Sequence, residues 1–305
     1  MNILSTIIPI FIVIFLGLFA RKLGFLTAEF LNQANRLVYY FAIPAMIFNS
    51  ISQAALKTEF HPSVIFICLF SITFMIIAAG FLSKLFSLPP SSKATFTQSS
   101  FHGNLGYIGL AVAFYYLGDS GLVKAAIIAG FVMILQNIAA VIVLQKGADG
   151  NDKKADIKAT VKTTLANPVI LSALAGIAYS LSGLPMPLIV ERALLIIKGM
   201  ALPLALLIIG ASLSFDKFKP IFLPVMMASC MKILAIPAIG LLLFKVLSIP
   251  SSDYLPGLII LAAPVATLTY IMGKELGGDP DFAAAAISFS TILSSVTYGF
   301  WLSVG

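Results

Sequence analysis

Long apolar runs alternate with short polar stretches along the whole chain. The runs cover residues 3–20, 34–53, 63–83, 96–117, 125–144, 165–182, 193–213, 221–244, 255–274 and 282–302. A helix that crosses a membrane needs about 20 apolar residues, whereas a barrel strand needs about ten with alternating polarity. The pattern therefore predicts an all-α membrane protein with ten transmembrane helices.

The composition agrees with this prediction. Hydrophobic residues make up 60% of the chain and charged residues 10%, against about 25% charged residues in soluble proteins. Arg21 and Lys22 follow the first run, whereas a signal peptide carries its positive residues in front, so this run is predicted to remain as a membrane span. Cys68 and Cys230 lie inside apolar runs and are interpreted as free thiols.

The two halves of the chain resemble each other. A shift of 159 residues aligns four pairs of punctuating residues: Pro9 with Pro168, Gly17 with Gly176, Gly24 with Gly183, and Pro44 with Pro203. The longest polar stretch, 145–163, lies near the midpoint. We therefore expect one repeat over 1–144, a linker over 145–164 and a second repeat over 165–305. Five spans in each half force the second repeat to enter the membrane upside down, an arrangement typical of secondary transporters.

The basic residues predict the orientation. Of the 19 Lys and Arg residues, 13 lie on the side of the loops that follow odd-numbered runs, five lie on the opposite side, and Lys232 lies in mid-run. Cytoplasmic loops carry the excess of Lys and Arg, so the linker is predicted to be cytoplasmic and both termini to lie outside a cell membrane that the chain crosses several times. This bias explains most of the net charge of +7, so no nucleic-acid partner is expected.

The fourth run is interrupted by residues that disfavour a helix. In "FHGNLGYIGLAVAFYYLGD" (101–119), small and polar residues crowd the first half: Gly103, Asn104, Gly106 and Gly109. A break inside a membrane is tolerated only where protein or a water-filled cavity surrounds the backbone, and it exposes half-helix ends to a ligand. The alternative is that the glycines serve close helix packing.

The repeat predicts a partner for this break. A shift of 160 aligns Asn104 with Pro264, in "LAAPVATLTYIMGKEL" (261–276), where the proline removes a backbone donor and two threonines supply hydroxyls. We expect the two breaks to cross at the membrane centre. The predicted substrate-binding residues at the crossing are Gly103, Asn104, Gly106, Pro264, Thr267 and Thr269.

Other polar residues lie in or beside the runs. Gln136 and Asn137 are expected to line the substrate site, the alternative being hydrogen bonds between helices. Tyr107 is expected to contact the substrate, because its ring can pack while its hydroxyl faces a cavity. His102 is interpreted as a packing residue, with a proton role left open, and Asn49 as a contact from a neighbouring helix.

Lys232 lies near the middle of the eighth run, about 15 Å from either interface. A lysine at a helix centre costs about 2.5–3.5 kcal/mol and calls for a partner, yet no acidic residue lies at the centre of a run. We consider an anionic substrate, the carbonyl ends of the broken helices with Lys232 in place of a cation, or a neutral, unpaired lysine. The first two favour a small organic anion as substrate.

The acidic residues argue against an enzyme. Asp119 and Asp279 are predicted on opposite sides of the membrane, about 30 Å apart, too far to act as the paired carboxylates of an intramembrane protease. No His-Glu-x-x-His or Gly-x-Ser-x-Gly motif occurs in the chain. We expect no catalysis, no metal site and no cofactor. A coupling proton or ion is left open, although a carboxylate usually helps to hold sodium.

Four segments together resemble the auxin efflux carrier family in its short bacterial form: "LNQANRLVYYFAIPAMIFNSI", "GNLGYIGLAVAFYYLGD", "NPVILSALAG" and "LAAPVATLTYIMGKELGGD". The resemblance covers essentially the whole chain. It implies ten spans in two inverted five-helix repeats, with spans four and nine broken and crossing. It also implies a scaffold of spans one, two, six and seven that forms a homodimer, and a transport domain of the other six that moves as an elevator.

We therefore expect a secondary transporter that moves a small organic anion, a carboxylate, across the cytoplasmic membrane. Its substrate would bind at the helix crossing and its other partners would be membrane lipids. Two alternatives remain at this point. One is a membrane receptor that binds a small carboxylate without transport, and the other is a sodium-coupled symporter of the more distantly related bile-acid fold.

Overall fold

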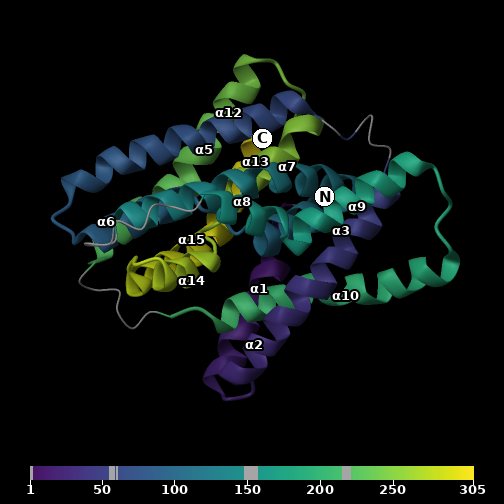
Figure 1. Ribbon diagram of the computed structural model, residues 1–305, viewed down its shortest axis with the longest axis horizontal. Coiled ribbons are helices and arrows are strands. Elements are labelled where there is room, and N and C mark those ends of the chain that lie inside the picture. Colours follow the sequence, from purple (N-terminus) through teal and green to yellow (C-terminus); the bar gives the residue numbers. More distant parts are fainter. Residues whose placement is uncertain (1–2, 55–58, 60, 148–156, 215–220) are drawn as a thin grey trace.

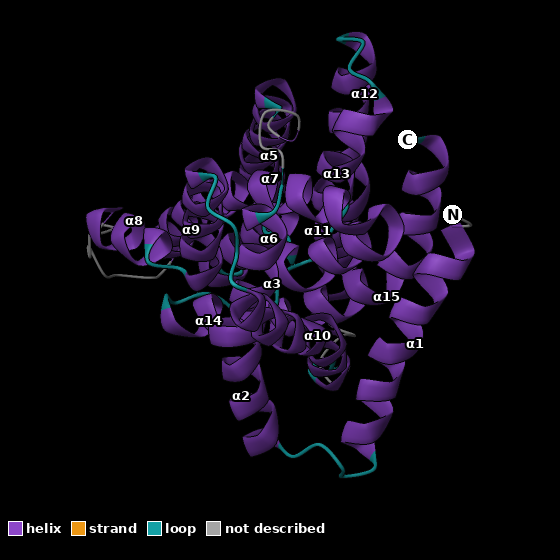
Figure 2. Ribbon diagram, turned by 90° about the vertical axis from the view of Figure 1, so that its right-hand side faces the viewer, coloured by secondary structure: helices purple, strands orange, loops and turns teal. Residues whose placement is uncertain are grey.

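The computed structural model describes residues 3–54, 59, 61–147, 157–214 and 221–305. Within these residues the regular structure is helical, apart from one isolated bridge between two chain segments. Figure 1 shows α2 and α10 on the lower side of the molecule and α5 and α12 on the upper side. In Figure 2, α1 and α2 run to the lower end, where a loop joins them.

The first half of the chain contains these helices: α1 (Ile3–Lys22), α2 (Ala28–Leu37), the π-helical turn η1 (Val38–Ala42), α3 (Ile43–Ser52), α5 (Pro62–Leu82), the short 3₁₀ turn η2 (Ser83–Leu85), α6 (Pro90–Phe101), the π-helical turn η3 (Leu105–Gly109) and α7 (Leu110–Gly147). The second half contains α8 (Ile157–Leu165), α9 (Pro168–Ser182), α10 (Leu188–Ala211), α11 (Phe222–Cys230), the π-helical turn η5 (Met231–Ala235), α12 (Ile236–Val246), α13 (Ser251–Leu261), α14 (Leu268–Glu275) and α15 (Pro280–Val304). Helix lies over each of the ten predicted runs.

Among the described residues, six helical segments are long and apolar enough to cross a membrane: Ile3–Lys22, Pro62–Leu85, Leu105–Gly147, Leu188–Ala211, Phe222–Val246 and Pro280–Val304. The protein is thus an all-helical, multi-span membrane protein. The segment Leu105–Gly147 covers two predicted runs, because α7 bends sharply at Gly118, whose φ of 74° and ψ of −162° lie outside the helical region. An L side chain at this φ would be strained, so glycine permits the turn.

The predicted linker contains helical residues at both of its ends. Helix α7 continues to Gly147, and α8 already begins at Ile157. Neither glycine nor proline occurs in "IKATVKTTL", so this polar segment can form a helix although it lacks an apolar run. The centre of the predicted linker, 148–156, lies outside the described residues.

Capping residues define where two of the spans begin. Asn167 accepts a hydrogen bond from the Val169 amide at the start of α9, and Asp279 does the same for the Phe282 amide at the start of α15. A proline follows each cap at the first helical position, where its missing amide costs nothing. The sequence therefore fixes the starts of these helices locally.

Two pairs of helices pack closely, α1 with α10 and α3 with α9. A Cβ atom added to Gly17 of α1 would overlap the Leu207 carbonyl oxygen of α10, and one added to Gly210 would overlap the Ile14 carbonyl oxygen. In the second pair, a Cβ atom on Gly176 would lie 3.3 Å from the Phe48 carbonyl oxygen. Small residues let membrane helices approach each other in this way.

The outer surface of the bundle is apolar. Helix α5 exposes Phe66, Phe70, Phe74, Ile77 and Phe81. Their spacing of three to four residues puts these side chains along one stripe of the helix. In water such a stripe would be unfavourable, whereas lipid tails are its natural solvent, so α5 is a helix at the lipid boundary.

Four glycines in the described residues have a positive φ: Gly24, Gly118, Gly183 and Gly277. Gly183 follows Gly24 by 159 positions, and Gly277 follows Gly118 by the same 159 positions. This spacing equals the shift that aligns the two halves of the sequence. The turns of the two halves therefore share a glycine with a positive φ at matching positions.

Candidate functional site

The two interrupted helices meet inside the protein. Helix α6 ends at Phe101 and α13 ends at Leu261, and their chains continue as short extended segments before η3 and α14 begin. The segments pair as an isolated antiparallel bridge between Gly103 and Val265. The Asn104 amide donates to the Pro264 carbonyl at 2.7 Å, and the Ala266 amide donates to the His102 carbonyl at 2.9 Å. We refer to this pairing as the crossing.

Side chains form hydrogen bonds with backbone groups beside the crossing that are not paired across it. Gln136 of α7 donates to the Phe101 carbonyl at 2.9 Å and accepts from the Gly103 amide at 3.3 Å. Ser290 of α15 accepts from the Val265 amide at 3.0 Å. A buried backbone group without a partner costs several kcal/mol in a membrane, so these contacts stabilise the non-helical chain at this depth. Gln136 thus stabilises the backbone of the crossing and also lines the cavity beside it.

Lys232 lies on η5, with 1% of its surface exposed. Its Nζ donates to the Leu261 carbonyl at 2.8 Å, which is the carbonyl end of α13. The sequence left three possibilities for Lys232. The contact in the structure is the one with the carbonyl end of a broken helix. A Cβ atom on Gly103 would come within 2.8 Å of Lys232 Cε, so glycine leaves room for the lysine.

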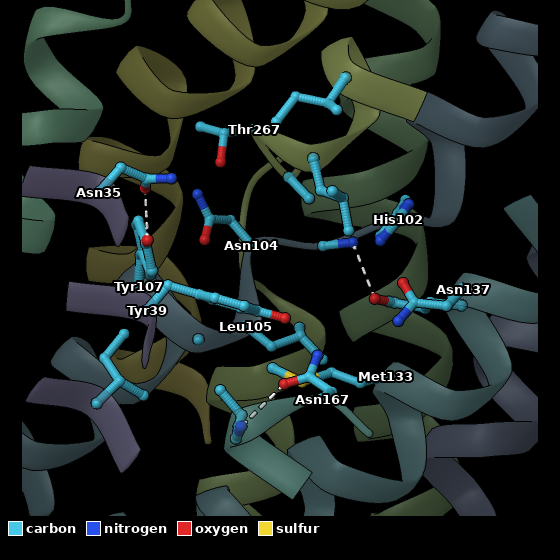
Figure 3. Close-up of a pocket in the computed structure, with 18 of the residues that line it drawn as sticks. Asn35, Tyr39, His102, Asn104, Leu105, Tyr107, Met133, Asn137, Asn167 and Thr267 are labelled. Atoms are coloured by element: carbon cyan, nitrogen blue, oxygen red, sulfur yellow. Dashed lines mark hydrogen bonds between the residues drawn. The ribbon is translucent and has the colours of Figure 1, made fainter. Parts of the chain in front are cut away.

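A cavity of about 380 Å³ lies beside the crossing. Figure 3 shows part of its lining, with Asn104, Thr267 and Tyr107 around the central space. Polar residues that line the cavity are Asn35, Arg36, Tyr39, Tyr40, His102, Asn104, Tyr107, Gln136, Asn137, Asn167 and Thr267. Among the described lining residues Arg36 carries the single formal charge and no acidic residue occurs. The cavity therefore suits an anion better than a cation.

Helix N-termini add to this preference. The half-helices of η3–α7 and α14 begin at the cavity with Leu105 and Leu268, and neither first turn has a side-chain cap. The first amides of a helix lack partners within it and carry the positive end of the helix dipole. An anion between the two half-helices can accept hydrogen bonds from such amides.

Asn104 supplies a further donor. Its side chain is 6% exposed, and Nδ2 is buried without a hydrogen-bond partner in the described structure. In Figure 3 the amide lies next to Thr267, in the space beside Asn35 and Tyr107. Buried polar groups in proteins are nearly always paired with protein, water or ligand. An unpaired amide that faces a cavity thus points to a ligand there.

Tyr107 connects the crossing to α2. Its hydroxyl donates to Asn35 Oδ1 at 2.6 Å, which joins η3 to a helix from the other side of the cavity (Figure 3). The prediction from the sequence did not include Asn35, Tyr39 or Asn167. Their spacing could have indicated two of them, because positions 35, 39 and 43 share one face of a helix and all three line the cavity.

The predicted site residues divide into two groups. Those at the cavity are Gly103, Asn104, Gly106, Tyr107, Gln136, Asn137 and Thr267, together with His102, whose Nδ1 lies 3.3 Å from Gln98 Nε2. Lys232, Pro264 and Thr269 are not among the lining residues. Pro264 contributes its carbonyl to the crossing, and Thr269 is fully buried, with a hydroxyl oxygen that has no described partner.

Asn49 lines a second cavity, of about 370 Å³, at the other end of the α2–η1–α3 helix. About 20 Å of helix separates it from Asn35, at a rise of about 1.5 Å per residue. Here Lys198 Nζ of α10 forms an ion pair with Asp119 Oδ1 of α7 at 2.6 Å, and it also donates to the Ser50 hydroxyl at 3.3 Å. The two cavities thus lie toward opposite ends of the same helix.

A multi-span helical protein whose broken helices enclose a polar cavity has the architecture of a membrane transporter. The chain belongs to the membrane transport protein family, whose model matches residues 2–302. This is the family of the auxin efflux carriers, so the resemblance found in the sequence is confirmed. The protein is accordingly a transporter and not an enzyme.

Curated relatives match over nearly their full length. The chain is 26% identical to a protein of Rhizobium meliloti named "putative malonate transporter", over 97% of this chain and 93% of that protein. It is 24% identical to an uncharacterized transporter of Methanothermobacter thermautotrophicus, over 97% of this chain and 96% of the relative. It is also 24% identical to an uncharacterized transporter of Methanocaldococcus jannaschii, over 98% of this chain and 97% of the relative.

Proposed function

We propose that this protein is a secondary transporter of a small organic anion, a carboxylate, which binds in the cavity beside the crossing. The observation that carries the proposal is the buried side-chain amide of Asn104, whose Nδ2 has no described partner, at a cavity whose described lining has no acidic residue. The N-termini of η3 and α14 support it, because the positive ends of their dipoles lie at the same space, although the amides of Leu105 and Thr269 already donate to the carbonyls of Gly103 and Ala266. A carboxylate matches these donors in charge and in size.

The relative from Rhizobium meliloti suggests the kind of carboxylate. Its name refers to malonate, a three-carbon dicarboxylate, and it matches almost the whole of this chain. A cavity of about 380 Å³ has ample room for such a molecule with water. We therefore take malonate as the first substrate to test.

The proposal includes ten membrane spans in two inverted five-helix repeats. The paired glycine turns, at a constant separation of 159, support this architecture. The close contacts support it as well, because Gly17 approaches the Leu207 carbonyl and Gly176 approaches the Phe48 carbonyl. Gly176 follows Gly17 by 159 positions, and Leu207 follows Phe48 by the same number. One packing contact thus occurs twice, once in each orientation of the repeat.

Alternating access is proposed to follow an elevator mechanism. The helices α1, α2–η1–α3, α9 and α10 would form the scaffold and the dimer contact, and α5 to α7 with α11 to α15 would form the moving transport domain. The cavity lies at the Arg36 end of the α2–η1–α3 helix, which the positive-inside rule assigns to the cytoplasm. The contact between Lys198 and Asp119 lies near the other end and would keep the outer side closed. The structure would then correspond to the inward-facing state.

Lys232 is proposed to take the place of a coupling cation. Its Nζ contacts the carbonyl end of α13, where a bound cation would otherwise compensate the helix dipole. In this reading sodium is not required for transport. Uptake that needs sodium would favour the symporter alternative.

The experiment compares binding with flux for the whole chain. Purified protein is titrated with malonate by calorimetry and reconstituted in vesicles for uptake of labelled malonate. Asn104→Ala is expected to weaken malonate binding by about tenfold or more, the usual effect of losing a hydrogen bond to a charged group. Asn32→Ala, which changes an exposed asparagine of α2, serves as the matched control.

Three outcomes would contradict the proposal. Binding of malonate without uptake would identify a receptor in place of a transporter. Unchanged binding in Asn104→Ala would move the site away from the crossing. If neither malonate nor other small carboxylates bind or are transported, an organic anion is the wrong substrate class.

A further inference from the structure

One face of the α2–η1 segment turns a charged residue toward the cavity. Arg36, Tyr39, Tyr40 and Ile43 all line it, and they follow the spacing i, i+3, i+4, i+7 that places residues on one side of a helix. Arg36 therefore belongs to the cavity-facing stripe of this segment, although it is exposed. Its guanidinium lies at the end of the stripe that is nearest to the start of α2.

The guanidinium of Arg36 has no hydrogen-bond or ion-pair partner among the described residues, unlike that of Arg21, which donates to the Leu26 carbonyl at 2.7 Å. An arginine presents five donors in a planar fork that fits a carboxylate with two parallel hydrogen bonds. An unpaired fork at the edge of a cavity is available for an anionic group. Asn35, its neighbour in the chain, accepts from the Tyr107 hydroxyl and so ties this turn of α2 to the crossing.

The cavity thus has two sets of anion-binding groups. One set lies at the crossing and consists of Asn104, Thr267 and the half-helix N-termini. The other is Arg36, on the opposing scaffold helix. A monocarboxylate can satisfy only one set, whereas a dicarboxylate has a charged group for each.

We propose that Arg36 binds the second carboxylate of a dicarboxylate substrate and thereby selects dicarboxylates over monocarboxylates. The inference rests on the proposed function, since it needs the first carboxylate to bind at the crossing. It assigns Arg36 a direct contact with substrate. A lysine at this position could supply the charge but not the planar, bidentate geometry.

The test compares malonate with malonamate, its monoamide, which has the same length and one carboxylate fewer. Affinities are measured by calorimetry on the purified whole chain for wild type, Arg36→Gln and Arg36→Lys. Lys22→Gln is the matched control, because it removes one exposed positive charge from the same predicted side. Melting temperatures without ligand establish that each variant is folded.

Wild type is expected to prefer malonate, and Arg36→Gln to reduce the ratio of the two affinities by about tenfold, the effect of one charge-assisted contact. Malonamate binding should stay within about threefold of wild type, and Arg36→Lys should fall between the two. An unchanged ratio, as a residue that only anchors lipid headgroups would give, overturns the inference. An equal loss for both anions also overturns it, because it indicates general attraction without contact.

The result separates the two proposals. If wild type binds malonate and Asn104→Ala weakens it while Arg36→Gln leaves the ratio intact, the site at the crossing stands and the role of Arg36 is wrong. If wild type binds neither these two anions nor any other small carboxylate, both are wrong.

Discussion

At the scale of residues, the crossing depends on side chains that complete its backbone hydrogen bonds. Gln136 serves both sides of the first break, and Lys232 caps the carbonyl end beside the second. Gln136 lies on the part of α7 beyond the bend at Gly118, and Lys232 lies on η5, so both reach the crossing from outside the half-helices that meet there. Side chains from neighbouring helical segments thus supply the hydrogen bonds that the non-helical backbone lacks. This explains how that backbone can lie inside a membrane, where water is not available as a partner.

Gly103→Ala should destabilise the protein through Lys232. The added methyl group would come within 2.8 Å of Lys232 Cε, and the lysine can move away only by giving up its bond to Leu261. Overpacking of this kind costs about 1–3 kcal/mol. The melting temperature should fall for Gly103→Ala and stay near wild type for Gly130→Ala, whose Cβ would meet nothing within 4 Å. Equal melting temperatures would show that Lys232 adapts without cost.

The sequence singled out some of the residues that line this cavity, for a physical reason. Asn104 and Gln136 stand out because amides inside an apolar run need partners. Arg36 and Asn167 do not stand out, because polar residues are ordinary near the ends of runs. Whether such a residue faces the cavity, lipid or water depends on how its helix packs. The spacing of residues predicts which of them share a helix face, but not what that face contacts.

At the scale of elements, α1 and α10 make the most extensive helix contact among the described residues. Gly210→Ala should weaken this packing, since its Cβ would overlap a backbone carbonyl that no side-chain rotation can move. We expect a loss of about 1–3 kcal/mol in stability and a lower melting temperature. Gly199→Ala lies on the same helix with open space around it and should have little effect. A similar melting temperature for both variants would mean that the helices can separate freely.

Helix positions followed from the sequence more readily than helix interruptions. Ten apolar runs correspond to helix because hydrophobic length is a local property. The location of the breaks was also local, since glycine, asparagine and proline mark them. The pairing of Gly103 with Val265 required the repeat as well, because it joins segments about 160 residues apart, and α8 was missed because it is polar.

At the scale of the whole molecule, the proposed orientation can be tested by labelling. Cysteines introduced at Gln53 and Lys158, both exposed in the structure, should react with an impermeant reagent from opposite sides of the membrane. The physical basis is the unequal distribution of basic residues across the predicted loops. Reaction of both from the same side would contradict ten spans in an inverted repeat.

The ion pair between Lys198 and Asp119, at the end of the molecule proposed to face outside, should bias the resting state. Asp119→Asn removes the partner of Lys198, and because the aspartate is 68% exposed the pair contributes only about 0.2–1 kcal/mol. A population shift of that size corresponds to about 1.4- to fivefold faster outside labelling of a cysteine at Val123, which lines the second cavity. Cys68 and Cys230 are first replaced by serine. Unchanged or slower labelling would argue against a closing role for the pair.

The position of Lys232 has an electrical consequence. If it moves with the crossing as an ammonium, the empty carrier transports one positive charge, worth about 2.3 kcal/mol per 100 mV of membrane potential over a full traverse. A negative cell interior would then draw the empty carrier toward its inward-facing state. A bound monoanion would cancel this charge, whereas a dianion would reverse its sign. Currents across voltage-clamped membranes would therefore report how many negative charges the substrate carries, and Lys232→Met would shift each of these currents by one charge.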